Sequence, residues 1–222
     1  MYQIPTFEEY INERLFKSSI DRIKSGGVRK EDIQPAPQTK KELIDIIGET
    51  LVEAKDNNVN YVDLNFIDVS NITDMSSLFY RFTDDIKKHI NVDISKWDVS
   101  NVENMTNMFQ LYEIFNCDLS KWDVSNVLKM HGMFSSCKKF NSDLSKWNVH
   151  KVVDMAKMFY NCVNFNCDLS KWDVIHVKYM RDMFINCKNL DCDLNDWDTF
   201  NCQEMWNMFQ GCDKITTPGW YH

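Results

Sequence analysis

The chain has 222 residues, of which 44% are hydrophobic and 13% aromatic, and it carries a formal net charge of -8. That composition allows one or two domains with a packed core, and the low content of glycine and proline, six and four residues, disfavours disorder. The acidic charge argues against nucleic acid as a partner, because binding a phosphate backbone requires clustered lysine and arginine, and no apolar run approaches the ~20 residues of a membrane span.

The first predicted element is an amphipathic helix close to the N-terminus. Thr6 and Glu9 form a capping box that opens it, and its apolar stripe consists of Phe7, Tyr10, Ile11, Leu15, Phe16, Ile20 and Ile23. A proline-containing linker follows, so residues 1–38 form the first segment. The helix is predicted either to fold back on the next helix or to mediate docking or self-association through residues 7–24.

The second predicted element is a helix over residues 39–55. Thr39 and Glu42 form another capping box. The apolar face predicted for this helix comprises Leu43, Ile44, Ile46, Ile47, Leu51 and Val52. Because the terminal unit of a stacked repeat exposes its apolar side, we expect this helix to cover the open end of the repeats that follow.

Residues 56–222 carry a tandem repeat with a period of 25 residues. An aspartate, a tryptophan and a Met-x-x-Met-Phe motif recur in this register, and the tryptophans are Trp97, Trp122, Trp147, Trp172 and Trp197. An earlier copy, with Ile67 in the tryptophan position, lies 30 residues before the next. We number these six copies, one to six, by their first methionine: Met75, Met105, Met130, Met155, Met180 and Met205.

Each copy is predicted to contain a short parallel strand, a turn and a short helix. The Asp-Leu-Ser-Lys-Trp piece, as in residues 143–147, suits the strand, and Asp-Val-Ser-Asn, as in residues 98–101, suits an Asx-type turn. The Met-x-x-Met-Phe spacing matches one helical turn. Since such a unit cannot bury its apolar side alone, the sequence predicts an α/β repeat solenoid: a leucine-rich-repeat-like stack of about six coils with an N-terminal helical cap.

The repeat also resembles a known family. Residues 115–127, which read Phe-Asn-Cys-Asp-Leu-Ser-Lys-Trp-Asp-Val-Ser-Asn-Val, and the segment Met130-x-x-Met133-Phe134-x-x-Cys137 are similar to the BspA-like surface repeat. This is a leucine-rich-repeat-type unit noted in mycoplasma lipoproteins and in gut and oral bacteria. The resemblance runs from Thr39 to about Cys212. It implies a solenoid and, for some members, adhesion to host proteins, while many members have no known function.

The compartment is predicted from the N-terminus. Residues 1–14 include Glu8, Glu9 and Glu13 and lack an apolar h-region, so they do not resemble a secretory signal. The sequence as written therefore predicts a cytoplasmic protein, while the family resemblance leaves the cell surface open.

The eight cysteines have three interpretations. Four of them form one ladder at the repeat period, Cys137, Cys162, Cys187 and Cys212, and a second ladder comprises Cys117, Cys167 and Cys192. Cys202 stands where other copies carry valine, which favours reduced, buried thiols that pack as small apolar side chains. Disulfides and a metal site are the alternatives.

The repeated aspartates would place like charges one coil apart, at Asp93, Asp118, Asp143, Asp168 and Asp193. Stacked like charges are destabilising, so we expect these carboxylates to accept backbone N–H groups in turns and to alternate with the repeated lysines. A calcium ladder is the alternative, although the glycine-rich aspartate turns of such ladders are absent.

The sequence has no motif for catalysis. Its five histidines share no register, and it lacks a nucleophile elbow, a phosphate-binding glycine loop and a zinc-protease motif. We therefore expect neither an enzyme nor a cofactor. The leading hypothesis is a non-catalytic protein-binding repeat scaffold, either adhesin-like or a protein-interaction module. The alternative is a structural component of an assembly, or of a phage or virus particle, tethered through the N-terminal helix.

Partner-binding residues are expected where the copies differ, because the shared positions are needed for stacking. Towards the C-terminus, positions that are polar in other copies become apolar or aromatic, at Ile175, Tyr179, Phe200 and Trp206. An exposed apolar patch of this kind often marks an interface. The alternative is a C-terminal cap, in which Trp220 and Tyr221 cover Phe200 and Trp206.

Overall fold

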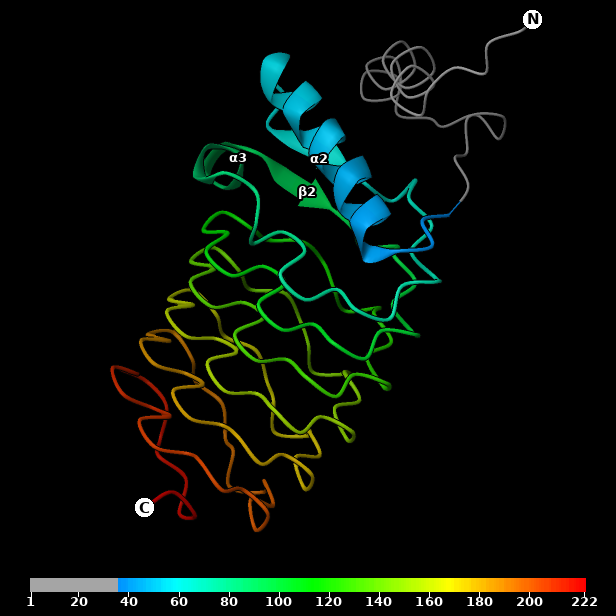
Figure 1. Ribbon diagram of the computed structural model, residues 1–222. Helices are drawn as coiled ribbons and strands as arrows, with labels where there is room; N and C mark the ends of the chain where they lie inside the picture. The colour runs from blue at the N-terminus through cyan, green and yellow to red at the C-terminus, as the bar shows by residue number, and fades with distance from the viewer. Residues whose placement is uncertain (1–35) are drawn as a thin grey trace, which may run out of the picture. The chain divides into compact units, whose positions relative to one another are not determined.

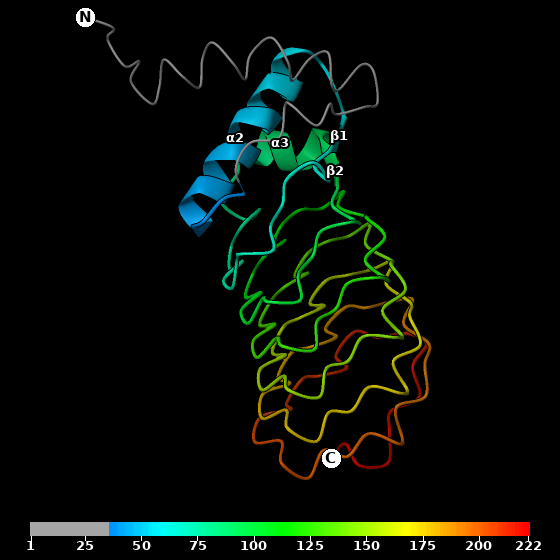
Figure 2. The ribbon, with the colours of Figure 1, turned by 90° about the vertical axis from the view of Figure 1, so that its right-hand side faces the viewer.

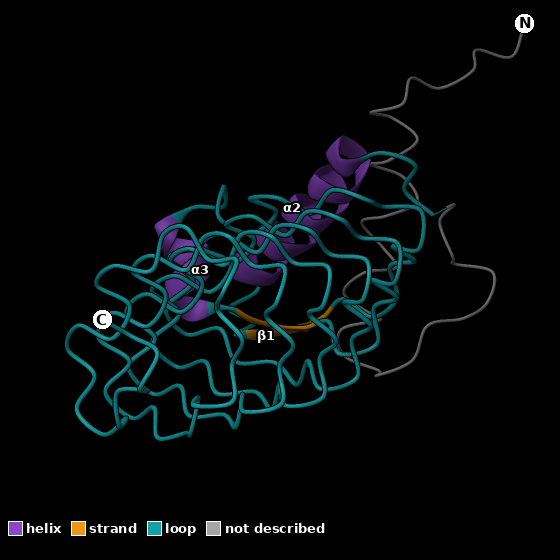
Figure 3. Cartoon of the chain, turned by 90° about the horizontal axis from the view of Figure 1, so that it is seen from below, coloured by secondary structure: helices purple, strands orange, loops and turns teal. Residues whose placement is uncertain are grey.

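The structure is a computed structural model, and it describes residues 36–222, which form one unit. Four elements lie in this range: α2 (Lys40–Asp56), β1 (Tyr61–Asp63), α3 (Asp84–His89) and β2 (Asn91–Asp93). Turns and loops make up most of the remaining chain (Figure 1, Figure 3). The helix expected near the N-terminus and its self-association through residues 7–24 lie outside the described residues, so both stay predictions.

Helix α2 begins at a capping box and packs on the first coil. The Thr39 hydroxyl accepts a hydrogen bond from the Glu42 N–H at 3.2 Å, and the Glu42 carboxylate accepts one from the Thr39 N–H at 3.3 Å, which satisfies two otherwise unpaired donors. Val52, expected on the apolar face, is instead 51% exposed. The residues that α2 buries are Leu43, Ile47, Leu51 and Ala54. Figure 1 shows α2 lying across the first of the coils. Neither α2 nor α3, the two helices within residues 36–222, is long and apolar enough to cross a membrane.

Successive copies lie side by side in parallel register. Strand β1 pairs with β2, with Val62 opposite Val92. Isolated parallel bridges then join the residue before the first methionine of each copy to its counterpart in the next, through the series Asp74, Asn104, Lys129, Asp154, Tyr179 and Glu204. Each coil thus rests on the previous one through backbone hydrogen bonds, and Figure 2 shows the coils following one another from α2 towards the C-terminus.

The local conformation within each copy differs from the expectation. In copies one and two the strands β1 and β2 end at the aspartate that begins the piece expected to form the strand, and copies three to six have no strand there. In the described copies the Met-x-x-Met-Phe segment is a run of turns rather than a short helix. The reason is that two positions per copy have a left-handed backbone, which a right-handed helix does not accommodate. The first position is filled by Ser77, Asn107, Gly132, Lys157, Asp182 and Asn207, and the second, from copy two onwards, by Leu111, Ser136, Asn161, Asn186 and Gly211.

One continuous core runs through the coils. The tryptophans of copies two to six are only 3% to 4% exposed, and each indole N–H donates to a carbonyl of the preceding copy, as from Trp147 to Leu119 at 3.0 Å. A column of rings runs beside them with centroids 5.5 to 5.7 Å apart, formed by Phe109, Phe134, Phe159 and Phe184. Stacking therefore buries apolar faces that a single copy would leave in water.

Candidate partner-binding surface

The repeated aspartates close turns of the backbone. In copies two to six, the Oδ1 atom of the aspartate four residues before the tryptophan accepts a hydrogen bond, at 2.9 to 3.0 Å, from the N–H two residues further on. This confirms the expected role in turns. Hydrogen bonds from the side chain and the backbone of the following serine hold the pKa of Asp118 and Asp143 below the ordinary value of 3.8. Within the described residues, no group of three or more histidine, cysteine and carboxylate side chains could hold a metal ion.

All eight cysteines, which lie within residues 36–222, are free thiols. The thiols of Cys137 and Cys162 donate to the carbonyls of the phenylalanines one coil earlier, at 3.1 and 2.9 Å. Burial raises the pKa of Cys117 to about 12 and that of Cys167 to about 11. Because the thiolate is the reactive form, these cysteines are protonated and unreactive near neutral pH, and they serve packing and hydrogen bonding.

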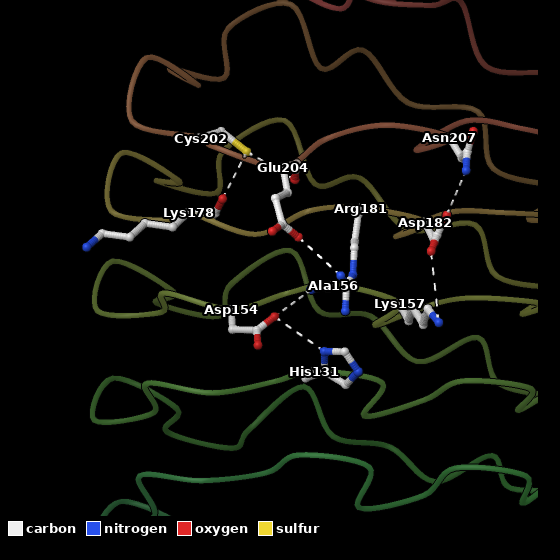
Figure 4. Close-up of polar contacts among 10 residues, drawn as sticks. All are labelled: His131, Asp154, Ala156, Lys157, Lys178, Arg181, Asp182, Cys202, Glu204 and Asn207. Carbon is white, nitrogen blue, oxygen red and sulfur yellow. Dashed lines mark hydrogen bonds and ion pairs between the residues drawn. The ribbon is translucent and has the colours of Figure 1, made fainter.

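The positions that vary between copies align on one face of the stack. The parallel bridges align the residue before the first methionine of each copy, from Asn104 to Glu204. The residue after that methionine forms a neighbouring row, Thr106, His131, Ala156, Arg181 and Trp206. We call these two rows the variable face. Figure 4 shows His131, Asp154, Arg181 and Glu204 following one another across the coils.

Ion pairs connect neighbouring coils across the variable face. His131 Nδ1 lies 3.5 Å from Asp154 Oδ1, and Arg181 Nη1 lies 3.3 Å from Glu204 Oε2. All four side chains are partly exposed, so each pair contributes no more than about 1 kcal/mol to stability. The ammonium group of Lys178 makes no ion pair within the described part of the chain, and Figure 4 shows its side chain extending away from the others. The face therefore offers polar and cationic groups as well as apolar ones.

The predicted partner-binding residues differ in exposure. Phe200 is 90% exposed and Trp206 is 49% exposed, whereas Ile175 and Tyr179 are partly buried. The C-terminal residues do not cover the two exposed rings. Trp220 instead continues the tryptophan column, since the centroid of its ring lies 6.3 Å from that of Trp197. The ring of Tyr221 packs on that of Phe209, with centroids 5.1 Å apart.

The four residues form two neighbouring pairs. Ile175 and Phe200 occupy the same position in adjacent copies, and the side-chain amide of the residue after Phe200 donates to the Ile175 carbonyl at 2.8 Å. Tyr179 is bridged to Glu204, two residues before Trp206. No contact between aromatic rings links Tyr179, Phe200 and Trp206 within residues 36–222, so each ring is free to contact a partner separately.

Residues 49–163 and 120–220 match a family described as Mycoplasma protein of unknown function, DUF285. The chain belongs to DUF285. No curated protein and no solved structure matches it. The two DUF285 matches overlap and together span all six copies, as expected when one family model covers several copies of a repeat. The match supports the mycoplasma part of the resemblance, and the finer BspA-like assignment stays a prediction.

The DUF285 repeats also carry surface residues that the sequence analysis missed. Leu128 is 39% exposed, and its carbonyl accepts a hydrogen bond from the N–H of Val153 in the next coil at 2.9 Å. In copies one and two the same position, which is next to the variable face, is filled by Thr73 and Glu103. Both line an open polar pocket together with Ser70, Asn71, Asn101 and Asn126. The residue at the position of Leu128 varies between copies as much as the residues at the four predicted partner-binding positions do. That variation could have identified this position from the sequence.

Proposed function

We propose that this DUF285 chain is a non-catalytic protein-binding scaffold, built as a leucine-rich-repeat-like solenoid of the BspA-like type. The fold is supported by the parallel bridges that recur at the repeat period and by the column of stacked phenylalanine rings. A stack of this kind presents an extended surface to which each copy contributes its own side chains, and such a surface suits recognition of a protein.

The exposure of Phe200 and Trp206 carries the proposal. Phe200 is 90% exposed and stands where copies one to three have serine, while Trp206 is 49% exposed and stands where copy two has Thr106. A ring in water adds little to the stability of the fold, whereas its burial in a complex would contribute about 1.5–3 kcal/mol. Aromatic anchors of this kind dominate the binding energy of many protein interfaces.

The proposal excludes catalysis because the residues that could react already serve the fold. Aspartates close turns, and buried thiols donate to carbonyls. His131 and His150 each pair with an aspartate of the next coil, at 3.5 and 2.7 Å, but with different aspartates at different places. An enzyme instead gathers its acid, base and nucleophile at one position.

The test exchanges the four site residues for those that copy two carries at the same positions: Ile175→Ser, Tyr179→Asn, Phe200→Ser and Trp206→Thr. Because these residues already occupy equivalent coils, the circular dichroism spectrum and the urea midpoint should change little. Proteins that co-purify with the wild-type chain from the cells that express it should decrease by about tenfold or more, the loss expected when aromatic anchors are removed.

A matched variant controls for loss of exposed apolar surface in general. It carries Val52→Ser, Tyr80→Ser and Leu111→Asn, three exposed residues away from the site. This variant should retain the wild-type set of bound proteins. The proposal is contradicted if the four-site variant and the matched variant retain the same proteins in equal amounts.

A further inference from the structure

Part of each coil bonds to the next coil in one direction only. In copy five, four N–H groups donate to carbonyls of copy six at 2.7 to 3.0 Å, and the donors are Met180, Asp182, Phe184 and Asn186. Copies two, three and four make the same four bonds to the copies that follow them. Each of these copies therefore presents N–H groups to the next one and carbonyls to the previous one.

Copy six carries the same four donors, and residues 213–222 supply no acceptor for them. The N–H groups of Met205, Asn207, Phe209 and Gly211 have no hydrogen-bond acceptor within the described residues. Asn207 and Gly211 have left-handed backbone, with φ of 57° and 73°, as do the equivalent residues of copies two to five, in which the same four N–H groups all donate to the next coil. We call this row of four N–H groups the open edge. An unpaired row of backbone groups is a ready template for another chain.

The C-terminal residues leave the open edge unpaired. The Tyr221 hydroxyl accepts a hydrogen bond at 3.1 Å from the N–H of Met208, which is not one of the four donors. Trp220 covers the core and donates to the Leu194 carbonyl at 2.8 Å. Trp206, which lies between the first two donors in the sequence, keeps 49% of its surface exposed. This end of the stack therefore combines unpaired donors with an exposed aromatic ring.

A second copy of this chain does not fit the open edge. At the other end of the stack, Lys87 Nζ already donates to the backbone carbonyl of Tyr80 at 3.0 Å, which occupies the position of the copy-six carbonyl that accepts from the fourth donor of copy five. Helix α2 also packs on the core at that end. Two open edges placed face to face would oppose donors with donors. An occupant of the open edge must therefore supply backbone carbonyls that neither end of the stack in a second copy offers.

We propose that the open edge binds an extended segment of a different protein. The backbone carbonyls of that segment accept hydrogen bonds from the four N–H groups, and one of its apolar side chains packs on Trp206. Strand addition of this kind gains affinity from main-chain hydrogen bonds and specificity from side-chain contacts. The proposal goes beyond the proposed function, because it rests on backbone groups at the end of the stack and shares only Trp206 with the variable face.

Amide hydrogen exchange followed by NMR tests the open edge directly. In the free protein, the N–H groups of Met205, Asn207 and Gly211 should exchange at least about 100-fold faster than their hydrogen-bonded counterparts Met180 and Asp182. A synthetic peptide with the sequence of residues 178–187, carrying Cys187→Ser, supplies carbonyls at the spacing of a further copy. Its addition should slow exchange at the open edge and shift those resonances.

Two variants and one hydrodynamic measurement complete the test. Trp206→Thr should weaken peptide binding about tenfold, while Tyr80→Thr, at an exposed aromatic in copy one, should leave it unchanged. Protected edge amides in the free protein, or absence of peptide binding, overturn the inference. If the edge amides become protected only at concentrations at which sedimentation shows a dimer, the edge binds a second copy, and the inference is overturned as well. Peptide-induced shifts confined to Ile175 and Tyr179 overturn it too, but leave the proposed function standing.

Discussion

Replacing Trp147 with alanine should lower the free energy of unfolding by about 4 kcal/mol. Trp147 is 4% exposed in the middle of the stack, and its ring stacks on that of Trp172 with centroids 6.5 Å apart. Burial of roughly 200 Å² of ring at ~25 cal/mol/Å² gives ~5 kcal/mol as an upper value, of which alanine keeps a small part. The hydrogen bond from its Nε1 to the Leu119 carbonyl, 3.0 Å long, adds about 1 kcal/mol, and the carbonyl keeps its second hydrogen bond, from the Trp122 N–H at 3.1 Å.

Urea denaturation followed by circular dichroism measures this change. Trp147→Phe keeps a six-membered ring but removes the N–H donor and part of the buried ring volume, so it should cost about 1–2 kcal/mol, less than the alanine substitution. Phe200→Ala, at a residue that is 90% exposed, is the control and should change stability by less than about 0.5 kcal/mol. A loss below about 1 kcal/mol for Trp147→Ala would refute the reasoning that stacked rings hold adjacent coils together.

Three further predictions concern the turns and the thiols. Acid should destabilise the fold, because turn aspartates such as Asp143 have a pKa below the value of 3.8 that they have in the unfolded chain. Their contribution to stability is fully present at pH values above 3.8 and is lost as the pH falls through the lower pKa of the folded state. Circular dichroism between about pH 6 and pH 2 measures this loss. Lys157→Gly should raise the free energy of unfolding, measured by urea denaturation, by about 0.5–1 kcal/mol, since φ is 59° there. Gly132→Ala at the same position of copy three should lower it, since φ is 58° there and the new Cβ would clash with the side-chain oxygen of Asn107. A thiol reagent should modify Cys202 before Cys137, which is fully buried and has a raised pKa, and mass spectrometry of partly labelled protein gives the order.

The sequence identified the core because stacking acts at one fixed spacing. Trp147 and Met155 recur at the 25-residue period, and both are buried in one cluster with their counterparts, except that Met205 in the last copy is only partly buried. The role of the aspartates was also predictable, since an aspartate followed by a serine two residues later suits a turn. Neither inference required knowledge of the local backbone. A residue that touches its own counterparts in neighbouring copies must recur in register, whatever conformation connects it to the next.

The local conformation was not predictable from the apolar spacing alone. Residues three and four apart, such as Met155, Met158 and Phe159, share one side of a helix, but consecutive tight turns also place them on one side. The deciding signal was polar: Asn107 and Gly132 occupy a left-handed position, which asparagine and glycine favour. Lys157 at the same position in copy four obscures that signal, because lysine rarely adopts a left-handed backbone.

The candidate site was predictable only where side chains define it. Comparison of the copies indicated that Trp206 is unusual, but whether it is exposed depends on where the C-terminal residues pack. Trp220 follows Trp197 by 23 residues, close to the repeat period, and it therefore packs on the tryptophan column rather than on Trp206. Trp220 takes the next place in the tryptophan column and donates to a carbonyl as the other indoles do. The open edge has no residue signature, because nearly every residue carries an N–H group. Its existence follows from the direction that left-handed residues such as Gly211 give to those groups, and from the lack of an acceptor for them within the described residues. Recognition at this end of the stack would therefore depend on backbone geometry, which comparison of side chains between copies does not reveal.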